Sequence, residues 1–178
     1  MCIRDSVVTN GAFSVDTNGG NITVAGNISA TNTSDTLSLS DGSGQGTLTI
    51  NGTISGLKSV TVVGDTAVHL GGNITTSAVA DGAIDITGPV TLEGDITIDA
   101  DAANTTVTFN SSATVNSDAS SSKRDLIIKT AGGAIAMQGA IGGSVSLDAI
   151  TINAGGVTGS GTIEICLLYT SPSPRDDR

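Results

Sequence analysis

The residues with the most chemical potential are carboxylates gathered in one stretch of the sequence. Six acids fall within 21 residues, namely Asp81, Asp85, Glu93, Asp95, Asp99 and Asp101. On neighbouring turns of one fold, two such acids could cleave a glycosidic bond, and a larger group could bind Ca²⁺. The plainer interpretation is a solvated acidic face that limits self-association. The sequence contains neither the Gly-Gly-x-Gly-x-Asp calcium repeat nor the EF-hand spacing. It therefore predicts no metal site.

His69 is the only histidine, and it lies between Val68 and Leu70. Alternation points it outward on a strand, where it is expected to be an ordinary surface residue. The two cysteines, Cys2 and Cys166, lie at the extreme ends of the chain and are not expected to form a disulfide. With one His and no Cys between them, the sequence supports neither a dyad of those residues nor a zinc site.

Basic residues are too few to position a sugar substrate. The central ones are Lys58, Lys123, Arg124 and Lys129. The last three flank the start of one predicted strand, which indicates the edge of a loop. The Gly-rich loops lack the Lys-Ser/Thr pair of a phosphate-binding loop. The sequence therefore predicts no catalytic residue and no cofactor, and the chain is not expected to be an enzyme.

Seven Asn-x-Ser/Thr triplets could accept a glycan in a secreted protein. They begin at Asn21, Asn27, Asn32, Asn51, Asn73, Asn104 and Asn110. In a chain this rich in Asn, Ser and Thr many such triplets arise by chance. Their modification is left open.

The overall composition excludes two classes of partner. The formal net charge is -10 and the pI is about 4.1, so the surface should repel phosphate backbones and the chain should not bind nucleic acid. No apolar stretch approaches the roughly 20 residues of a membrane helix. Aromatic residues make up only 2% of the chain. Together with many Val, Ile and Leu residues, this indicates a thin interior filled by small branched side chains.

The two ends of the chain can be encoded by one DNA sequence read on opposite strands. Residues 1–6 can be encoded by a word whose reverse complement encodes residues 166–170. That word resembles the transposon mosaic end used as a sequencing-library adapter, and residues 171–176 resemble the primer arm that follows it. We therefore expect residues 1–6 and 166–178 to be adapter-derived, with the second segment disordered. The protein-coding part would then be residues 7–165 of a longer gene.

One phrase recurs along that central part: apolar, any, apolar, any, usually Gly, any, apolar. It occupies residues 22–28, 48–54, 68–74, 90–96, 107–113 and 135–141, and residues 163–165 open a seventh copy. A second series of short alternating runs lies between the copies, at 13–15, 37–39, 60–62, 84–86, 126–128, 145–147 and 150–152. The period of roughly 20 to 25 residues is in the range of solenoid repeats.

Each run is too short to be stable alone, but equivalent runs stacked in register would bury one aliphatic column and pair their backbones. Gly residues would form the corners, and polar stretches such as 41–46 and 116–122 would project from them. The fold class predicted is an all-β, single-stranded parallel β-helix of about seven coils, with residues 7–165 as one domain. The alternative is an antiparallel β-sandwich, which also has short strands and Gly-rich turns.

Three phrases carry a family resemblance: Gly-Asn-Ile-Thr, Gly-Asp-Ile-Thr-Ile-Asp-Ala, and the run at residues 139–156. They resemble the repeats of filamentous-haemagglutinin-like and autotransporter-like bacterial adhesins, and the resemblance covers most of residues 12–165. It implies a right-handed β-helical stalk of a secreted, cell-surface protein, whose partners are the adjacent coils. The alternatives are a β-helical carbohydrate-active enzyme with an acidic face near Asp85–Asp101, and a module that binds host glycan or matrix through outward Thr residues. The isolated segment is expected to self-associate end to end.

Overall fold

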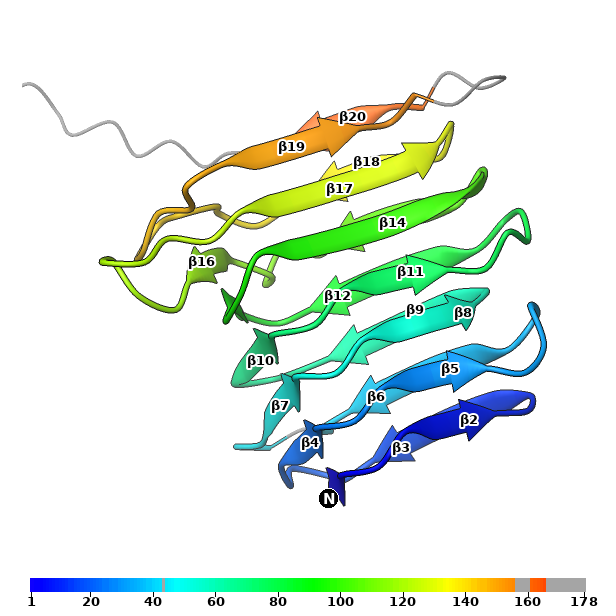
Figure 1. Cartoon of the computed structure of the whole chain (residues 1–178). Coiled ribbons are helices and arrows are strands. Elements are labelled where there is room, and N and C mark those ends of the chain that lie inside the picture. The colour runs from blue at the N-terminus through cyan, green and yellow to red at the C-terminus, as the bar shows by residue number, and fades with distance from the viewer. Residues whose placement is uncertain (43, 156–160, 166–178) are drawn as a thin grey trace, which may run out of the picture.

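The computed structural model describes residues 1–42, 44–155 and 161–165, and of Asp101 and Ala103 only the backbone. The regular elements in these ranges are all β-strands, and none of these residues belongs to a helix that could cross a membrane. The strands form three sheets, A, B and C, which the chain visits in that order as it winds. Figure 1 shows strands of successive turns lying one above another, from the blue first turn to the orange last one.

Through the first six turns, each sheet takes every third strand of the chain. Sheet A contains β1 (Cys2–Ile3), β4 (Ile22–Val24), β7 (Thr47–Ile50), β10 (Ala67–Leu70), β13 (Val90–Leu92) and β16 (Val115–Ser117). Sheet B contains β2 (Val7–Thr9), β5 (Ile28–Ala30), β8 (Ile54–Leu57), β11 (Ile74–Thr76), β14 (Ile96–Ala103), β17 (Leu126–Ala131) and β19 (Ile150–Asn153). Sheet C contains β3 (Ala12–Asp16), β6 (Thr36–Ser40), β9 (Ser59–Val63), β12 (Ala83–Thr87), β15 (Thr106–Phe109), β18 (Ile135–Met137) and β20 (Ile163–Ile165).

All pairings between these strands are parallel and join one turn to the next. Register partners lie between 19 residues apart, as for Leu57 and Thr76, and 30 apart, as for Ile96 and Leu126. Six turns place a strand in every sheet, and a seventh contributes β19 and β20. The structure thus confirms the parallel β-helix and excludes the antiparallel sandwich.

Alternation along each strand separates an aliphatic interior from a polar exterior. In β9, Val60 and Val62 are fully buried, whereas Ser59, Thr61 and Val63 are half-buried on the outside. The inward residues of all three sheets join into one continuous core. Removing each such side chain from water contributes roughly 1.5–3 kcal/mol, which offsets the ordering of strands only two to eight residues long.

The corner between sheets A and B is a three-residue turn in the early part of the rod, with Gly at its centre. A Cβ atom on Gly52 would lie 2.0 Å from the carbonyl oxygen of Gly26, and one on Gly72 would lie 2.1 Å from that of Gly52. Successive corners therefore stack so closely that only a residue without a side chain fits. This approach of backbones explains the Gly of the sequence phrase at Gly26, Gly52 and Gly72.

The recurring phrase does not mark one column of the structure, and here the sequence interpretation was wrong. The copies beginning at Ile22, Leu48, Val68 and Val90 begin in sheet A, but those beginning at Val107, Ile135 and Ile163 begin in sheet C. The switch falls in the 17-residue interval between Val90 and Val107, which belong to the same turn. The second series changes in the same way, because Phe13 lies in sheet C whereas Leu126 lies in sheet B.

The copies fall in different sheets because the phrase encodes only local structure. It specifies a short strand, a tight Gly corner and the first inward residue of the following strand. A three-sided coil has more than one corner at which this combination can occur. The final apolar residue of the early copies, such as Ile28 or Ile54, begins a strand of sheet B that the two-series interpretation omitted. Each turn therefore contains three strands rather than two.

Candidate functional site

The acidic residues of the 81–101 stretch do not share one face. Asp85 points outward from β12 in sheet C, whereas Asp99 points outward from β14 in sheet B. Glu93 and Asp95 lie in the corner between sheets A and B, and Asp81 precedes β12. A stretch of this length covers most of one turn, so its acids are distributed around the rod. The side chain of Asp101 lies outside the described part.

Most of these acids have partners within the protein. Asp99 lies 3.9 Å from the ammonium of Lys129, which is its register partner one turn later. The Asp81 carboxylate accepts a hydrogen bond of 3.3 Å from the Asn104 amide. Asp85 occupies a register column of outward hydroxyl residues that includes Thr61 and Thr108. These geometries describe separate surface contacts on different sides of the rod.

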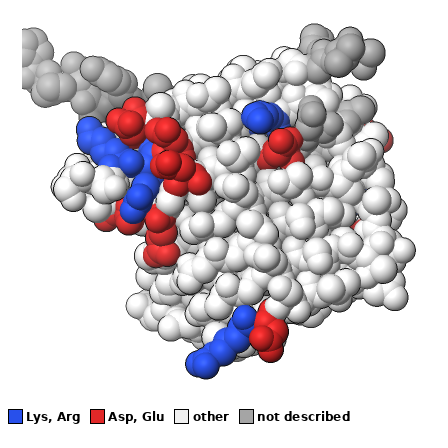
Figure 2. All heavy atoms as spheres, in the orientation of Figure 1, with Lys and Arg blue, Asp and Glu red and all other residues white. Residues whose placement is uncertain are grey.

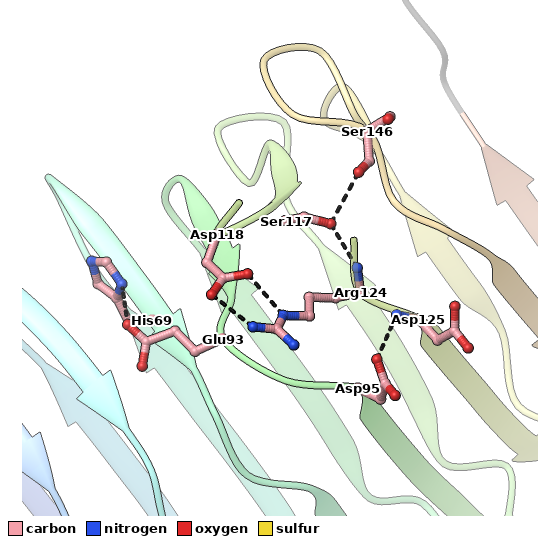
Figure 3. A network of polar contacts seen from close by, with 8 residues as sticks. All are labelled: His69, Glu93, Asp95, Ser117, Asp118, Arg124, Asp125 and Ser146. Carbon is pink, nitrogen blue, oxygen red and sulfur yellow. Dashed lines mark hydrogen bonds and ion pairs between the residues drawn. The ribbon is translucent and has the colours of Figure 1, made fainter. Parts of the chain in front are cut away.

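His69 points outward from β10 as alternation predicted, but the structure adds a partner that the sequence analysis missed. Its Nδ1 atom lies 2.8 Å from Oε1 of Glu93, one turn later, and both side chains are about one-third exposed. The two atoms lie within ion-pair distance, but the Nδ1 atom has no hydrogen-bond partner among the described residues. Figure 3 shows the two side chains facing each other at the edge of sheet A. The sequence contained a signal for this contact. The offset between Val68 and Val90 places Glu93 above Gly71, two residues after His69.

The A-to-B corner widens abruptly in the sixth turn. It spans three residues after β4, β7, β10 and β13, but eight residues, 118–125, after β16. We call residues 118–125 the widened corner. Figure 1 shows it projecting beside β16. The polar projection expected at 116–122 is thus found at 118–125, because residues 116 and 117 belong to β16. Lys123 and Arg124 lie within it.

A bidentate ion pair closes the base of the widened corner. Arg124 donates from Nε and from one terminal nitrogen to the two carboxylate oxygens of Asp118, at 2.8 and 2.9 Å. Hydrogen bonds from Arg124, supported by its charge, hold the pKa of the Asp118 carboxyl below its ordinary value, and the same pairing raises the pKa of Arg124. This fork geometry fixes the loop more firmly than a single contact would.

Hydrogen bonds also join the widened corner to the seventh turn. The buried Ser117 hydroxyl accepts from the backbone N–H of Arg124 at 2.9 Å and donates to the carbonyl of Ser146 at 3.0 Å. The N–H of Asp148 donates to the carbonyl of Arg124 at 3.0 Å, and Asp95 accepts from the N–H of Asp125 at 3.1 Å. Figure 3 shows how these contacts bring three successive turns together. The arrangement orders the base of a loop.

Figure 2 shows the charged side chains gathered in a few groups on this view of the rod, the largest of them over the widened corner. In the close-up of this region, Asp118 lies against Arg124, and Asp95 lies against the backbone of Asp125 (Figure 3). In the described part of the chain, no three or more His, Cys, Asp or Glu side chains are placed to hold a metal ion. The sequence expectation of no metal and no cofactor stays a prediction.

Two buried carboxylates were not anticipated. Asp41, placed by the sequence in a polar loop, is fully buried and accepts from the backbone N–H of Asp65 at 3.0 Å. Asp35 is 4% exposed. Burial acts to raise the pKa of Asp35, but hydrogen bonds from Gly11, Asn32 and Thr9 together hold it below its ordinary value. Both acids lie at the ends of β6, where they bond to backbone at the corners.

Several of the Asn-x-Ser/Thr asparagines are structural. Oδ1 of Asn27 accepts from the backbone N–H of Thr53 at 2.9 Å, and Oδ1 of Asn73 accepts from that of Thr97 at 2.8 Å. Asn21 makes the same bond to the following turn. The amide oxygens of these exposed side chains thus continue the turn-to-turn bonding where the strands end. Whether any asparagine carries a glycan is not decided by these contacts.

Comparison with known proteins gives the chain no relatives. No family model, no curated protein and no solved structure matches it. The adhesin resemblance of the sequence therefore stays a prediction. So does the adapter origin of both ends: Cys2–Ile3 form β1 with Cys2 exposed, and Cys166 and the rest of 166–178 lie outside the described residues.

Proposed function

We propose that this chain is a structural stalk segment of a large secreted bacterial surface protein of the adhesin type, and that its residues do not catalyse a reaction. The observation that supports a scaffold is the continuity of the core. Buried aliphatic residues extend from Ile3 in the first turn to Met137 in the sixth, and every turn between them is bonded to the next. Such a rod sets a distance and transmits force along its axis.

The distribution of charge supports the same function. Asp118 is paired with Arg124, Asp99 with Lys129, and the buried Asp35 and Asp41 bond to backbone. Of the acids that the sequence analysis considered for catalysis, Asp99 is thus engaged with the following turn, and the other three acids make contacts of the same structural kind. The partners of this segment are the adjacent coils of its own chain, and its acidic surface disfavours nucleic acid.

A screen of the full chain against polysaccharides tests the absence of catalysis. We expect no release of reducing ends or unsaturated products above a buffer control. Turnover that disappears in the triple variant Asp85→Asn, Glu93→Gln, Asp95→Asn would overturn the proposal in favour of a carbohydrate-active enzyme. Turnover that persists in this variant would also overturn it and would place the site elsewhere.

Antibodies raised against the chain test its location. We expect them to label intact, unpermeabilised cells of the source bacterium. Labelling only after permeabilisation would contradict a surface location.

Arrays of glycans and extracellular-matrix proteins test the alternative of direct adhesion, since a scaffold should bind none of them. Saturable binding lost on replacing the outward Thr61 and Thr108 by Ala would make this segment an adhesive module.

A further inference from the structure

The tip of the widened corner differs from the other corners in its accessibility. Ser120, Ser121, Ser122 and Lys123 are consecutive exposed residues. Ala119 and Ser122 form an isolated antiparallel bridge, so the tip is a small turn outside the three sheets. Lys123 makes no hydrogen bond or ion pair within the described part of the chain. An endoprotease needs several residues of extendable chain around the bond it cleaves, and a loop tip of this kind provides them.

The other described basic residues lie where the backbone cannot be extended. Lys58 is half-buried, and its N–H donates to the carbonyl of Asp35 at 2.8 Å. Lys129 lies within β17, whose backbone pairs with β14 on one side and with β19 on the other. Arg4 is exposed but belongs to a three-residue corner against which the next turn packs. Opening any of these sites would break turn-to-turn hydrogen bonds.

Arg124, although adjacent to Lys123, is protected by its own contacts. Its guanidinium is held by both oxygens of Asp118, and its carbonyl accepts from the N–H of Asp148. A protease that inserts a basic side chain into an acidic pocket must first remove that side chain from its partner. The Lys123 side chain requires no such step, and only the N–H of the cleaved bond must leave the Ser117 hydroxyl, which it contacts at 2.9 Å. The two neighbouring basic residues therefore differ in susceptibility.

We propose that the widened corner is a proteolytic processing site, at which an endoprotease specific for basic residues cleaves the bond between Lys123 and Arg124. The step is a hydrolysis: the C–N bond breaks, water supplies the hydroxyl of the new Lys123 carboxyl group, and its remaining hydrogen completes the new amino group of Arg124. No oxidant, reductant or cofactor takes part. The product is a rod made of two chains.

The two pieces remain together because the stacking that joins them lies on either side of the cut. Strand β17 remains paired with β14, from Leu126 opposite Ile96 to Ala131 opposite Ala103. Strand β18 remains paired with β15. The pair of Asp118 and Arg124 then bridges the two chains. The new ammonium group at Arg124 appears where the backbone N–H donated to the Ser117 hydroxyl, so this contact can also bridge the two chains.

Limited digestion of the full chain with trypsin under native conditions, followed by intact-mass measurement, tests the site. We expect a piece comprising residues 1–123 to appear first. In Lys123→Ala its formation should slow by at least about tenfold. Lys129→Ala, which changes an exposed lysine on the paired strand β17, should leave the rate unchanged. A first internal cut after Lys58, Arg124 or Lys129, or a Lys123→Ala variant cut at the wild-type rate, would overturn the proposal.

The protection of Arg124 has its own test. Asp118→Asn preserves the shape of the carboxylate but weakens its hold on the guanidinium. Cleavage should then become faster and include the bond after Arg124. Cleavage unchanged in rate and position would refute the protective role assigned to the pair. The cleaved protein should elute from a sizing column at the position of the intact chain, and separation into two pieces would refute the two-chain rod.

Discussion

Gly52 lies directly against Gly72 of the following turn, so that a Cβ atom on Gly72 would come within 2.1 Å of the Gly52 carbonyl oxygen. Gly94 holds the same place in the next corner, yet its nearest neighbour would lie 3.8 Å away. Two glycines at equivalent positions of the repeat therefore experience different packing. The spacing between turns, rather than the local turn conformation, determines which of them is essential.

This difference predicts opposite responses to one substitution. Gly72→Ala should destabilise the rod by about 1–3 kcal/mol, the usual effect of overpacking, because backbone cannot move aside. Gly94→Ala should leave the free energy of unfolding unchanged or slightly raised. Urea denaturation followed by circular dichroism measures both. Equal midpoints for the two variants would show that the turns are not stacked as closely as the structure places them.

The inward and outward positions of β14 make a second matched pair. Ile96 is 1% exposed, whereas Thr97 is its outward neighbour. Ile96→Asp removes a buried aliphatic group and places a charge in the core, so we expect a loss of several kcal/mol or no folded protein. Thr97→Asp should fold normally. Thermal unfolding of both proteins checks the expectation, and similar behaviour of the two would contradict the assigned orientation of the strand.

Asp35 should make the free energy of unfolding depend on pH in the acidic range. Its folded-state pKa lies below the ordinary value of 3.8, so its carboxylate stabilises the fold above that value and loses this effect as the pH falls through the folded pKa. Asp35→Asn should therefore be less stable than wild type near pH 7, and the difference should shrink below about pH 4. Denaturant titrations at several pH values measure it.

The control for that titration is Asp148→Asn, which changes an exposed carboxylate of a corner loop. The free energy of unfolding of this variant should differ little from that of wild type at every pH, because the Asp148 side chain is exposed to water. If the free energy of unfolding of Asp35→Asn differed from that of wild type by the same amount from pH 7 to pH 3, the hydrogen bonds to Asp35 would not distinguish its carboxylate from the neutral acid.

Sequence alternation was sufficient to predict the fold class and the direction in which individual side chains point. Ile96, Val60 and Leu39 are buried, and His69 and Thr97 point outward, as a period of two requires. Alternation is local, so it survives any error in aligning the turns. It could not assign the copies beginning at Val90 and Val107 to different sheets, because both encode the same strand and corner.

The contacts of the candidate residues depended on information that a single run does not contain. His69 meets Glu93 only because of the register between β10 and β13, and Asp41 is buried because Asp65 of the next turn covers it with a backbone N–H. The pair of Asp118 and Arg124 depends on the path of a loop that has no repeat to predict it. Composition and spacing thus identified the charged residues, but the stacking of turns determined their partners.

The ends of the rod should associate with one another. Strands β19 and β20 are the last members of sheets B and C in the described part, and Ile150, Ile163 and Ile165 on them are 40%, 50% and 42% exposed. At the opposite end, β2 and β3 begin the same two sheets in the same direction. A second copy placed head to tail would therefore continue both sheets as parallel pairs and cover the exposed isoleucines.

Analytical ultracentrifugation over a range of concentrations should accordingly show elongated oligomers in exchange with monomer. The double variant Ile163→Lys, Ile165→Lys places charges at one end and should shift the equilibrium toward monomer, since lysines at a strand edge oppose pairing. Thr61→Lys introduces a similar charge on the outer face midway along the rod and should leave association unchanged. If Thr61→Lys had the larger effect, contact between rods would be lateral, and a monomer at all concentrations would show that the ends do not pair.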